Sequence, residues 1–152
     1  MTQRIVVVTG GAGGIGLAIC RRVTQAGARA VVVDVDGPRA EAAAAEIGSG
    51  AVAVPCDVTD VDQVNELLKE VEALCGTCTA LVSNVGWTPE KPFLDTTLEE
   101  QERIIDVNYA GSLAKKLQNR LAGSIKLIGV IRILLSTRKA YNGLFFVLCS
   151  HS

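Results

Sequence analysis

Near the start of the chain a run of glycines lies between an apolar segment and a helical pattern. Residues 5–8, Ile-Val-Val-Val, are all β-branched and predict a strand buried on both faces. Gly10, Gly14 and Gly16 follow in the spacing Gly-x-x-x-Gly-x-Gly, and apolar residues then recur at helical spacing up to Val23. Because glycine adopts backbone conformations closed to other residues, this order predicts a strand, a tight turn and a helix.

Three more short apolar runs follow, separated by longer amphipathic stretches. They show no polar alternation, which is typical of strands buried on both faces of a parallel sheet. The alternation of strands and helices predicts an α/β fold, a Rossmann-like doubly wound parallel sheet. Four strands are expected at residues 5–8, 30–33, 51–54 and 80–82. The sheet is predicted to be incomplete, with one or two further strands possible at residues 124–135 and 144–148.

Glycine and proline mark the ends of the first two helices. Gly27 is expected to end the first helix in a left-handed conformation. Pro38 fits the first turn of the second helix, which we expect to continue to Ile47 and to end before Gly48.

Polar caps indicate where the next two helices begin. We expect Thr59 to cap a third helix that starts near Asp60. A fourth helix should follow Thr97, which forms a capping box with Glu100 three residues later. The predicted apolar face of the third helix contains Val61, Val64, Leu68 and Val71.

Composition indicates one globular domain in a reducing compartment. The chain has 152 residues, of which 49% are hydrophobic and 20% charged, and this balance excludes a disordered chain. The apolar run at residues 5–8 is too short for a secretory signal. The five cysteines are odd in number and scattered, which favours free thiols over a disulfide framework. We therefore expect a cytoplasmic protein.

Charge divides the chain into two regions. Residues 1–106 contain all 16 acidic residues and 8 of the 15 basic ones, so the remainder contains 7 basic residues and no acidic one. We place a boundary near residue 111, between a nucleotide-binding region, residues 1–110, and a basic, apolar tail, residues 111–152, which is expected to pack on the same domain.

The composition of the tail argues against a membrane-spanning helix and against a nucleic-acid partner. Its apolar stretch at residues 121–135 is interrupted by Lys126 and Arg132 and falls short of the roughly 20 apolar residues of a membrane span. A basic segment lying on a membrane or against a partner is the alternative. Because the tail lacks clustered cations and an aromatic platform, we expect no nucleic-acid partner.

The glycine turn has the chemistry of a diphosphate site. Gly10 permits the turn, Gly14 lets the backbone approach a diphosphate, and Gly16 allows close packing of helix and strand. The N–H groups at the start of the helix would then face the negative charge. The alternative is a flexible glycine turn that binds nothing.

The motif Thr9-Gly10-x-x-x-Gly14-Ile15-Gly16 resembles that of the short-chain dehydrogenase/reductase family. This resemblance implies a domain that binds a nicotinamide dinucleotide through Gly10, Gly14, Ile15 and Gly16. It also implies hydride transfer to or from a small alcohol, ketone or 3-oxoacyl substrate, and a possible homo-oligomer that forms through the fourth helix.

Asp34 ends the second predicted strand, 18 residues after Gly16. A carboxylate there accepts hydrogen bonds from the adenosine ribose and repels a 2′-phosphate, so we predict NAD(H) in preference to NADP(H). Gly13 and Val35 lie where phosphate-preferring relatives often have a basic residue, and both are uncharged. The alternative is that Asp34 only caps the turn after the strand.

Two other turns resemble family motifs. The segment Cys56-Asp57-Val58-Thr59-Asp60 implies that Asp57 and Val58 contact adenine, although Asp57 could instead only cap the third helix. The segment Ser83-Asn84-Val85-Gly86 resembles the family's Asn-Asn-Ala-Gly and implies that Asn84 and Gly86 hold the sheet edge against the cofactor. Trp87 follows, either as a cover for nicotinamide or substrate or as a packing residue.

The resemblance also implies four catalytic residues, of which one is recognisable. Val107-Asn108-Tyr109-Ala110-Gly111 matches the helix segment that supplies the catalytic Asn, although Asn108 could be purely structural. The family's Tyr and Lys are four residues apart, which places both on one helix face. Neither tyrosine has a lysine four residues later. Tyr141, with Ser136 and Lys139 nearby, does not reproduce the family's order of Ser, Tyr and Lys.

Two hypotheses remain open. The first is an oxidoreductase of this family that uses NAD(H), and the second is a catalytically silent, NAD-binding or interaction fragment of it. Because Tyr-x-x-x-Lys is absent, we favour impaired catalysis and expect a divergent, truncated or frameshifted tail. No metal site is expected, because Cys75 and Cys78 lack further ligands and follow a helix instead of preceding one. His151 is expected to be solvated.

Overall fold

The computed structural model describes residues 3–108. Its elements alternate between strands and helices up to the fourth strand, after which a short 3-10 helix and a last α-helix follow. In chain order they are β1 (Ile5–Thr9), α1 (Gly14–Gln25), β2 (Arg29–Asp34), α2 (Gly37–Ile47), β3 (Val52–Pro55), α3 (Val61–Cys75), β4 (Ala80–Val82), η1 (Phe93–Asp95) and α4 (Leu98–Asn108).

The four strands form one parallel sheet in the order β3-β2-β1-β4, which confirms the predicted fold class. In the register, Val7 of β1 lies beside Val31 of β2 on one side and Leu81 of β4 on the other. The chain winds outward from β1 to β3 and then crosses to the other side of β1 for β4. This reversal opens a crevice at the carboxyl ends of β1 and β4, where open α/β sheets bind ligands.

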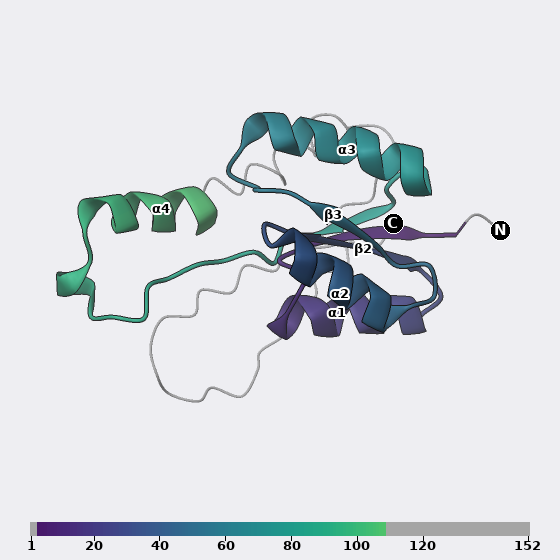
Figure 1. Cartoon of the computed structure of the whole chain (residues 1–152), viewed down its shortest axis with the longest axis horizontal. Helices are drawn as coiled ribbons and strands as arrows, with labels where there is room; N and C mark the ends of the chain where they lie inside the picture. The colour runs from purple at the N-terminus through teal and green to yellow at the C-terminus, as the bar shows by residue number, and fades with distance from the viewer. Residues whose placement is uncertain (1–2, 109–152) are drawn as a thin grey trace, which may run out of the picture.

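Helices cover both faces of the sheet, with α1 and α2 on one side and α3 on the other (Figure 1). Successive residues of β2 alternate between the two cores. Val31 and Val33 pack on the α3 side with Leu67, while Val32 packs on the other side with Ala40 of α2. Burial on both faces explains why these strands are continuous apolar runs in the sequence.

The predicted helix ends are confirmed for α1, α2 and α4. Gly27 and Gly48 follow α1 and α2 with φ values of +80° and +63°. At α4 the Thr97 amide donates to Glu100 Oε2 at 2.8 Å, and the Glu100 amide donates to Thr97 Oγ1 at 3.2 Å. Both hydrogen bonds of the expected capping box are therefore present.

Two predictions about α3 are wrong. Asp60, not Thr59, caps the helix, because its carboxylate accepts from the amides of Asp62 and Gln63, whereas the Thr59 hydroxyl donates to Asp57. The predicted apolar face is also wrong at one of its four positions, Val61. Val61 is 47% exposed in the first turn, and Leu67, which was not predicted, is fully buried. Val64 and Val71 lie in the core as expected, with Leu68 packed against it.

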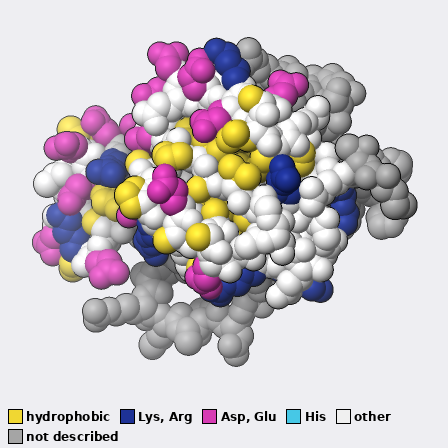
Figure 2. Space-filling model, turned by 45° about the vertical axis from the view of Figure 1, so that its right-hand side comes forward, with side chains coloured by type: hydrophobic (Ala, Val, Ile, Leu, Met, Phe, Trp, Pro, Cys, Tyr) yellow, Lys and Arg dark blue, Asp and Glu magenta, His cyan; other side chains and the backbone are white. Residues whose placement is uncertain are grey.

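The region of η1 and α4 differs from the rest, because neither element contains a buried residue. In Figure 1, α4 lies beyond the edge at which the strands end. Acidic side chains gather at that end of the molecule in Figure 2. Within residues 3–108, no helix has the length and hydropathy needed to cross a bilayer. The tail segments predicted as strands, together with Ser136, Lys139, Tyr141 and His151, lie outside the described residues.

Candidate functional site

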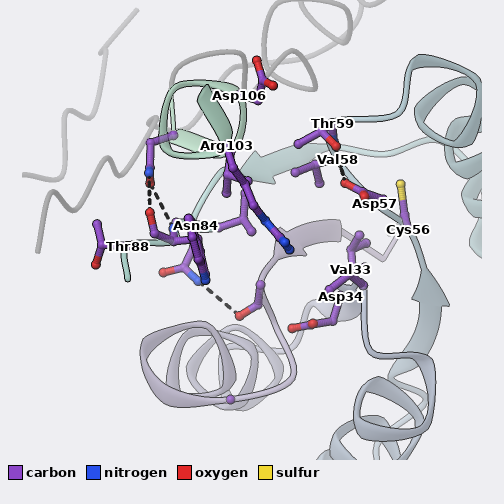
Figure 3. A pocket seen from close by; sticks show the side chains of 18 of the residues that line it. Val33, Asp34, Cys56, Asp57, Val58, Thr59, Asn84, Thr88, Arg103 and Asp106 are labelled. Carbon is purple, nitrogen blue, oxygen red and sulfur yellow. Dashed lines mark hydrogen bonds between the residues drawn. The ribbon is translucent and has the colours of Figure 1, made fainter. Parts of the chain in front are cut away.

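A cleft of about 970 Å³ lies at the carboxyl edge of the sheet, a size typical of small-molecule sites. The loops that follow all four strands contribute to its wall, and α4 closes it on the remaining side (Figure 3). Every residue predicted to bind the cofactor, except Gly16, lines this cleft: Gly10, Gly14, Ile15, Asp34, Asp57, Val58, Asn84 and Gly86. Asn108 lines it as well.

The glycine loop is shaped by two different constraints. At Gly16 a Cβ atom would lie 2.0 Å from the backbone oxygen of Gly10, so no side chain fits there. Gly14 has open space around it but a φ of +52°, which other residues rarely adopt. Gly16 is therefore needed for close packing and Gly14 for its backbone conformation.

The start of α1 suits an anion. Gly13 caps the helix without any side-chain hydrogen bond, and no acidic residue occupies the first turn. Gly14 and Ile15, the first two residues of α1, line the cleft. Backbone N–H groups and the positive end of the helix dipole thus meet the cleft with no carboxylate of their own turn to neutralise them.

Asp34 extends from the end of β2 into the cleft and also anchors the turns around it. Its Oδ2 accepts from the amide of Ala12 at 3.2 Å, and its Oδ1 accepts from the amide of Asp36 at 3.2 Å. The cap suggested as an alternative role is therefore present. Each carboxylate oxygen has a second lone pair, so these bonds orient the group and leave capacity for a ribose hydroxyl.

The turn after β3 is held by Asp57, whose Oδ1 accepts from the amide and the hydroxyl of Thr59 at 2.9 and 2.7 Å. Asp57 does not cap α3, since Asp60 does. Val58 belongs to the core on the α3 side and also lines the cleft. Burial, with the nearby charges of Asp57 and Asp60, raises the pKa of the Cys56 thiol to about 11. Cys56 thus remains protonated in the cleft wall near neutral pH.

Asn84 joins the end of β4 to the glycine loop. Its Nδ2 donates to the backbone oxygens of Thr9 and Gly10 at 3.1 and 3.2 Å, and its amide donates to Thr9 Oγ1 at 3.0 Å. Figure 3 shows the Asn84 side chain pointing towards that loop. Because Thr9 is fully buried, Asn84 fixes the loop relative to the sheet core.

At the opposite end of the cleft, Asn108 holds the segment that follows β4. Its Oδ1 accepts from the amide of Trp87 at 3.1 Å, while its Nδ2 donates to the backbone oxygens of Trp87 and Ile104 at 2.6 and 2.9 Å. The structural role left open for Asn108 is thus present. The guanidinium of Arg103 lies 4.9 Å from the centre of the half-buried Trp87 ring, a cation–π contact.

The sequence did not point to Arg39 and Arg103, two cations that line the cleft. Figure 3 shows Arg103 reaching from α4 into the cleft, towards the side where Asp34 lies. The available signal for Arg39 was its position five residues after Asp34, in the first turn of α2. For Arg103 there was no signal, because its approach depends on how α4 lies over the sheet edge.

The Cys75 and Cys78 pair has no sign of redox or metal chemistry. Both are free thiols, and burial raises the pKa of Cys78, which makes it a poor nucleophile. Among residues 3–108, no group of three or more His, Cys, Asp or Glu side chains is placed to hold a metal ion.

A parallel sheet with a glycine turn at its switch point places this protein in the class of Rossmann-like α/β folds. The sequence profile of the short chain dehydrogenase family matches residues 4–119, which extends past the boundary expected near residue 111. The chain belongs to this family, whose members bind nicotinamide dinucleotides.

Curated relatives support the assignment. Galactitol 2-dehydrogenase of Agrobacterium fabrum is 34% identical over 113 residues, which are 74% of this chain and 44% of the relative. Sorbitol dehydrogenase of Cereibacter sphaeroides is 34% identical over 107 residues, 70% of this chain and 42% of the relative. The chain therefore spans less than half the length of these relatives.

Solved structures agree with this assignment. A short chain dehydrogenase from Mycobacterium smegmatis superposes with a TM-score of 0.71 at 30% identity, over 78% of this chain and 51% of that one. The 3-ketoacyl-(acyl-carrier-protein) reductase from Brucella melitensis, solved with NADH, superposes with a TM-score of 0.68 at 30% identity, over 75% of this chain and 48% of that one.

Proposed function

We propose that the cleft binds NAD(H) in preference to NADP(H). The observation that carries this proposal is the Asp34 carboxylate, which two backbone amides hold at the cleft wall at the end of β2. In this position it accepts hydrogen bonds from the hydroxyls of the adenosine ribose and repels a 2′-phosphate. The diphosphate binds at the start of α1, against Gly14 and Ile15, and adenine lies near Asp57 and Val58.

The reaction that we propose for the full-length family fold is hydride transfer between the bound cofactor and a small alcohol, ketone or 3-oxoacyl compound. The named relatives are a galactitol and a sorbitol dehydrogenase and a 3-ketoacyl reductase, which supports this substrate class. We propose that the chain of residues 1–152 binds the cofactor without efficient turnover. No tyrosine in it precedes a lysine by four residues, and the Asn108 amide is already engaged with Trp87.

The second candidate is an active oxidoreductase in which Tyr141 serves as the proton donor, with Ser136 and Lys139 nearby in the sequence. The observation in its favour is the size of the cleft, about 970 Å³, together with Asn108 in its wall. We also propose a cytoplasmic location and assembly into a homo-oligomer, and analytical ultracentrifugation of the full chain tests the assembly.

Binding is tested by titrating the full chain with NADH and with NADPH. Trp87, the only tryptophan, lines the cleft and provides an intrinsic fluorescence signal. We expect saturable binding of NADH, tighter than that of NADPH. Asp34→Ala should lose about tenfold in NADH affinity, because a hydrogen bond to a charged group contributes roughly 1.5–3 kcal/mol. The matched control is Glu41→Gln, which removes an exposed carboxylate of α2 that does not line the cleft.

Unchanged NADH affinity in Asp34→Ala would contradict the assignment of Asp34. Turnover is then followed by the absorbance of the reduced nicotinamide with a panel of polyols, secondary alcohols and 3-oxoacyl thioesters. Binding without turnover supports the silent chain. Turnover that Tyr141→Phe abolishes would instead establish the second candidate.

A further inference from the structure

Arg39 lies at the cleft in a position that no family motif marked. It belongs to the first turn of α2, where its amide donates to the Asp36 cap at 3.1 Å. Its side chain lies against the glycine loop, since a Cβ atom at Gly13 would be only 2.2 Å from Arg39 Nη2 and 3.0 Å from Cζ. The guanidinium thus lies between α2 and the start of α1, in a wall that also includes Asp34 and Val35.

The charge of Arg39 is not neutralised by an ion pair in the described part of the chain. The pairs found there join Arg21 with Glu46, Lys69 with Glu66, and Lys91 with Glu100. Asp34, the carboxylate in the same wall, is bonded to backbone amides. An exposed guanidinium without an acidic partner is therefore available to an anion that enters this part of the cleft.

Gly13 explains how the guanidinium comes so close. With a φ of −165° and a ψ of 175°, Gly13 is in extended backbone that any residue adopts. Its small size, not its conformation, is therefore what matters. A side chain at position 13 would occupy the space of the Arg39 guanidinium. Because Gly13 has no side chain, the guanidinium of Arg39 can lie against the glycine loop.

We propose that Arg39 binds the 2′-phosphate of NADP(H) and partly offsets the repulsion from Asp34. Asp34 and Arg39 would then act on the same 2′-phosphate with opposite effects, because both lie where the ribose is expected beyond the end of β2. The chain should accept NADP(H) as a second, weaker and salt-dependent cofactor. This inference rests on the proposed dinucleotide site and changes its selectivity from exclusion of the 2′-phosphate to a graded preference.

The test compares the ratio of the NADPH and NADH dissociation constants in several variants. Arg39→Gln should raise this ratio about tenfold, the effect of one charge-assisted hydrogen bond. Gly13→Ala should raise it by a smaller factor because it displaces the guanidinium. Arg22→Gln is the matched control, since it removes an exposed cation of α1 that does not line the cleft. Added salt should weaken NADPH binding more than NADH binding.

Three outcomes would overturn the proposal. An equal loss for both nucleotides in Arg39→Gln would place Arg39 on the shared diphosphate or adenine. Unchanged affinities for both nucleotides would show that Arg39 does not contact the cofactor, and NADH binding with no NADPH binding at millimolar concentration would show that Asp34 dominates. In each case NADH still binds, so the proposed function stands. If neither nucleotide binds the native chain, the proposed function fails and this inference fails with it.

Discussion

The two ends of the cleft are supported by very different amounts of packing. At the glycine-loop end, formed by the turns after β1 and β2, the walls continue directly into fully buried strands such as residues 31–33. At the α4 end, formed by residues 87–108, neither η1 nor α4 contains a buried residue, and Leu94 is 92% exposed. The cleft is therefore firmly supported on one side and held by a few polar contacts on the other.

This difference separates two tasks of a dinucleotide site. The glycine-loop end contains the groups that we propose for phosphate and ribose. Sheet packing fixes these groups in advance, which reduces the entropic cost of binding. In the proposed binding mode the α4 end would face the nicotinamide, and its geometry depends on Asn108 and on the contact between Arg103 and Trp87. We expect cofactor affinity to come from the first end and catalytic geometry from the second.

The largest effect on NADH binding is expected at Gly16, where helix α1 packs most closely against the glycine loop. Gly16→Val would place side-chain atoms against the backbone oxygen of Gly10 and should abolish NADH binding or unfold the chain. Gly14→Ala is the comparison, because it has open space and costs only backbone strain of about 1–3 kcal/mol. Circular dichroism and NADH titration measure both. Equal affinities in the two variants would show that helix packing at Gly16 does not shape the loop.

Stability should respond to the core and not to α4. Leu67→Ala removes a fully buried side chain between α3 and the sheet and should lower the free energy of unfolding by about 2–5 kcal/mol. Leu98→Ala changes a side chain that is 72% exposed and should cost less than about 0.5 kcal/mol. Urea denaturation measures both. A large loss in Leu98→Ala would mean that α4 is packed against something in solution.

A more local effect is expected at the α4 end. Asn108→Ala removes both hydrogen bonds to the Trp87 backbone and should shift the Trp87 emission to longer wavelength as the ring gains solvent. Binding of 5′-AMP, which probes only the glycine-loop end, should change less than twofold. If 5′-AMP affinity fell as much as in Asn84→Ala, which loosens the glycine loop, the two ends would not be independent.

The smallest effect concerns pH at the start of α4. The Lys91 ammonium, with the Thr97 amide, lowers the pKa of Glu100. The carboxylate therefore supports the capping box above its usual pKa, and that support is lost as the pH falls through the lowered value. A carbon-13 NMR titration should show a Glu100 midpoint below that of an ordinary glutamate, and Lys91→Met should raise it. A midpoint that does not move would remove Lys91 as the cause.

The sequence predicted the glycine-loop end of the cleft better than the α4 end. Strands of a parallel sheet that are buried on both faces are continuous apolar runs, and a diphosphate-binding turn needs glycine at fixed positions. The sequence therefore predicted β1, β2 and the glycine loop correctly. The error at α3 has a simple origin. Thr59 and Asp60 are both good caps, and the choice between them depends on the Asp57 turn, which engages the Thr59 hydroxyl.

The cations of the cleft were not predictable, because their role depends on distance in space. Arg39 becomes informative only once Gly13 is seen beside its guanidinium. Likewise, Asn108 was found by its motif, but its contacts with Trp87 required the fold. Local motifs thus predicted several of the residues that line the cleft, but not its cations, and tertiary packing determined which side chains are already engaged in hydrogen bonds.

In this protein the glycine-loop end alone should supply a preformed site for the adenosine part of the cofactor. Isothermal titration calorimetry of the full chain with 5′-AMP and, separately, with nicotinamide mononucleotide tests it most directly. We predict saturable one-to-one binding of 5′-AMP, weakened in Asp34→Ala, and no measurable binding of nicotinamide mononucleotide. Binding of the mononucleotide without 5′-AMP, or 5′-AMP binding that is indifferent to Asp34→Ala, would contradict the account.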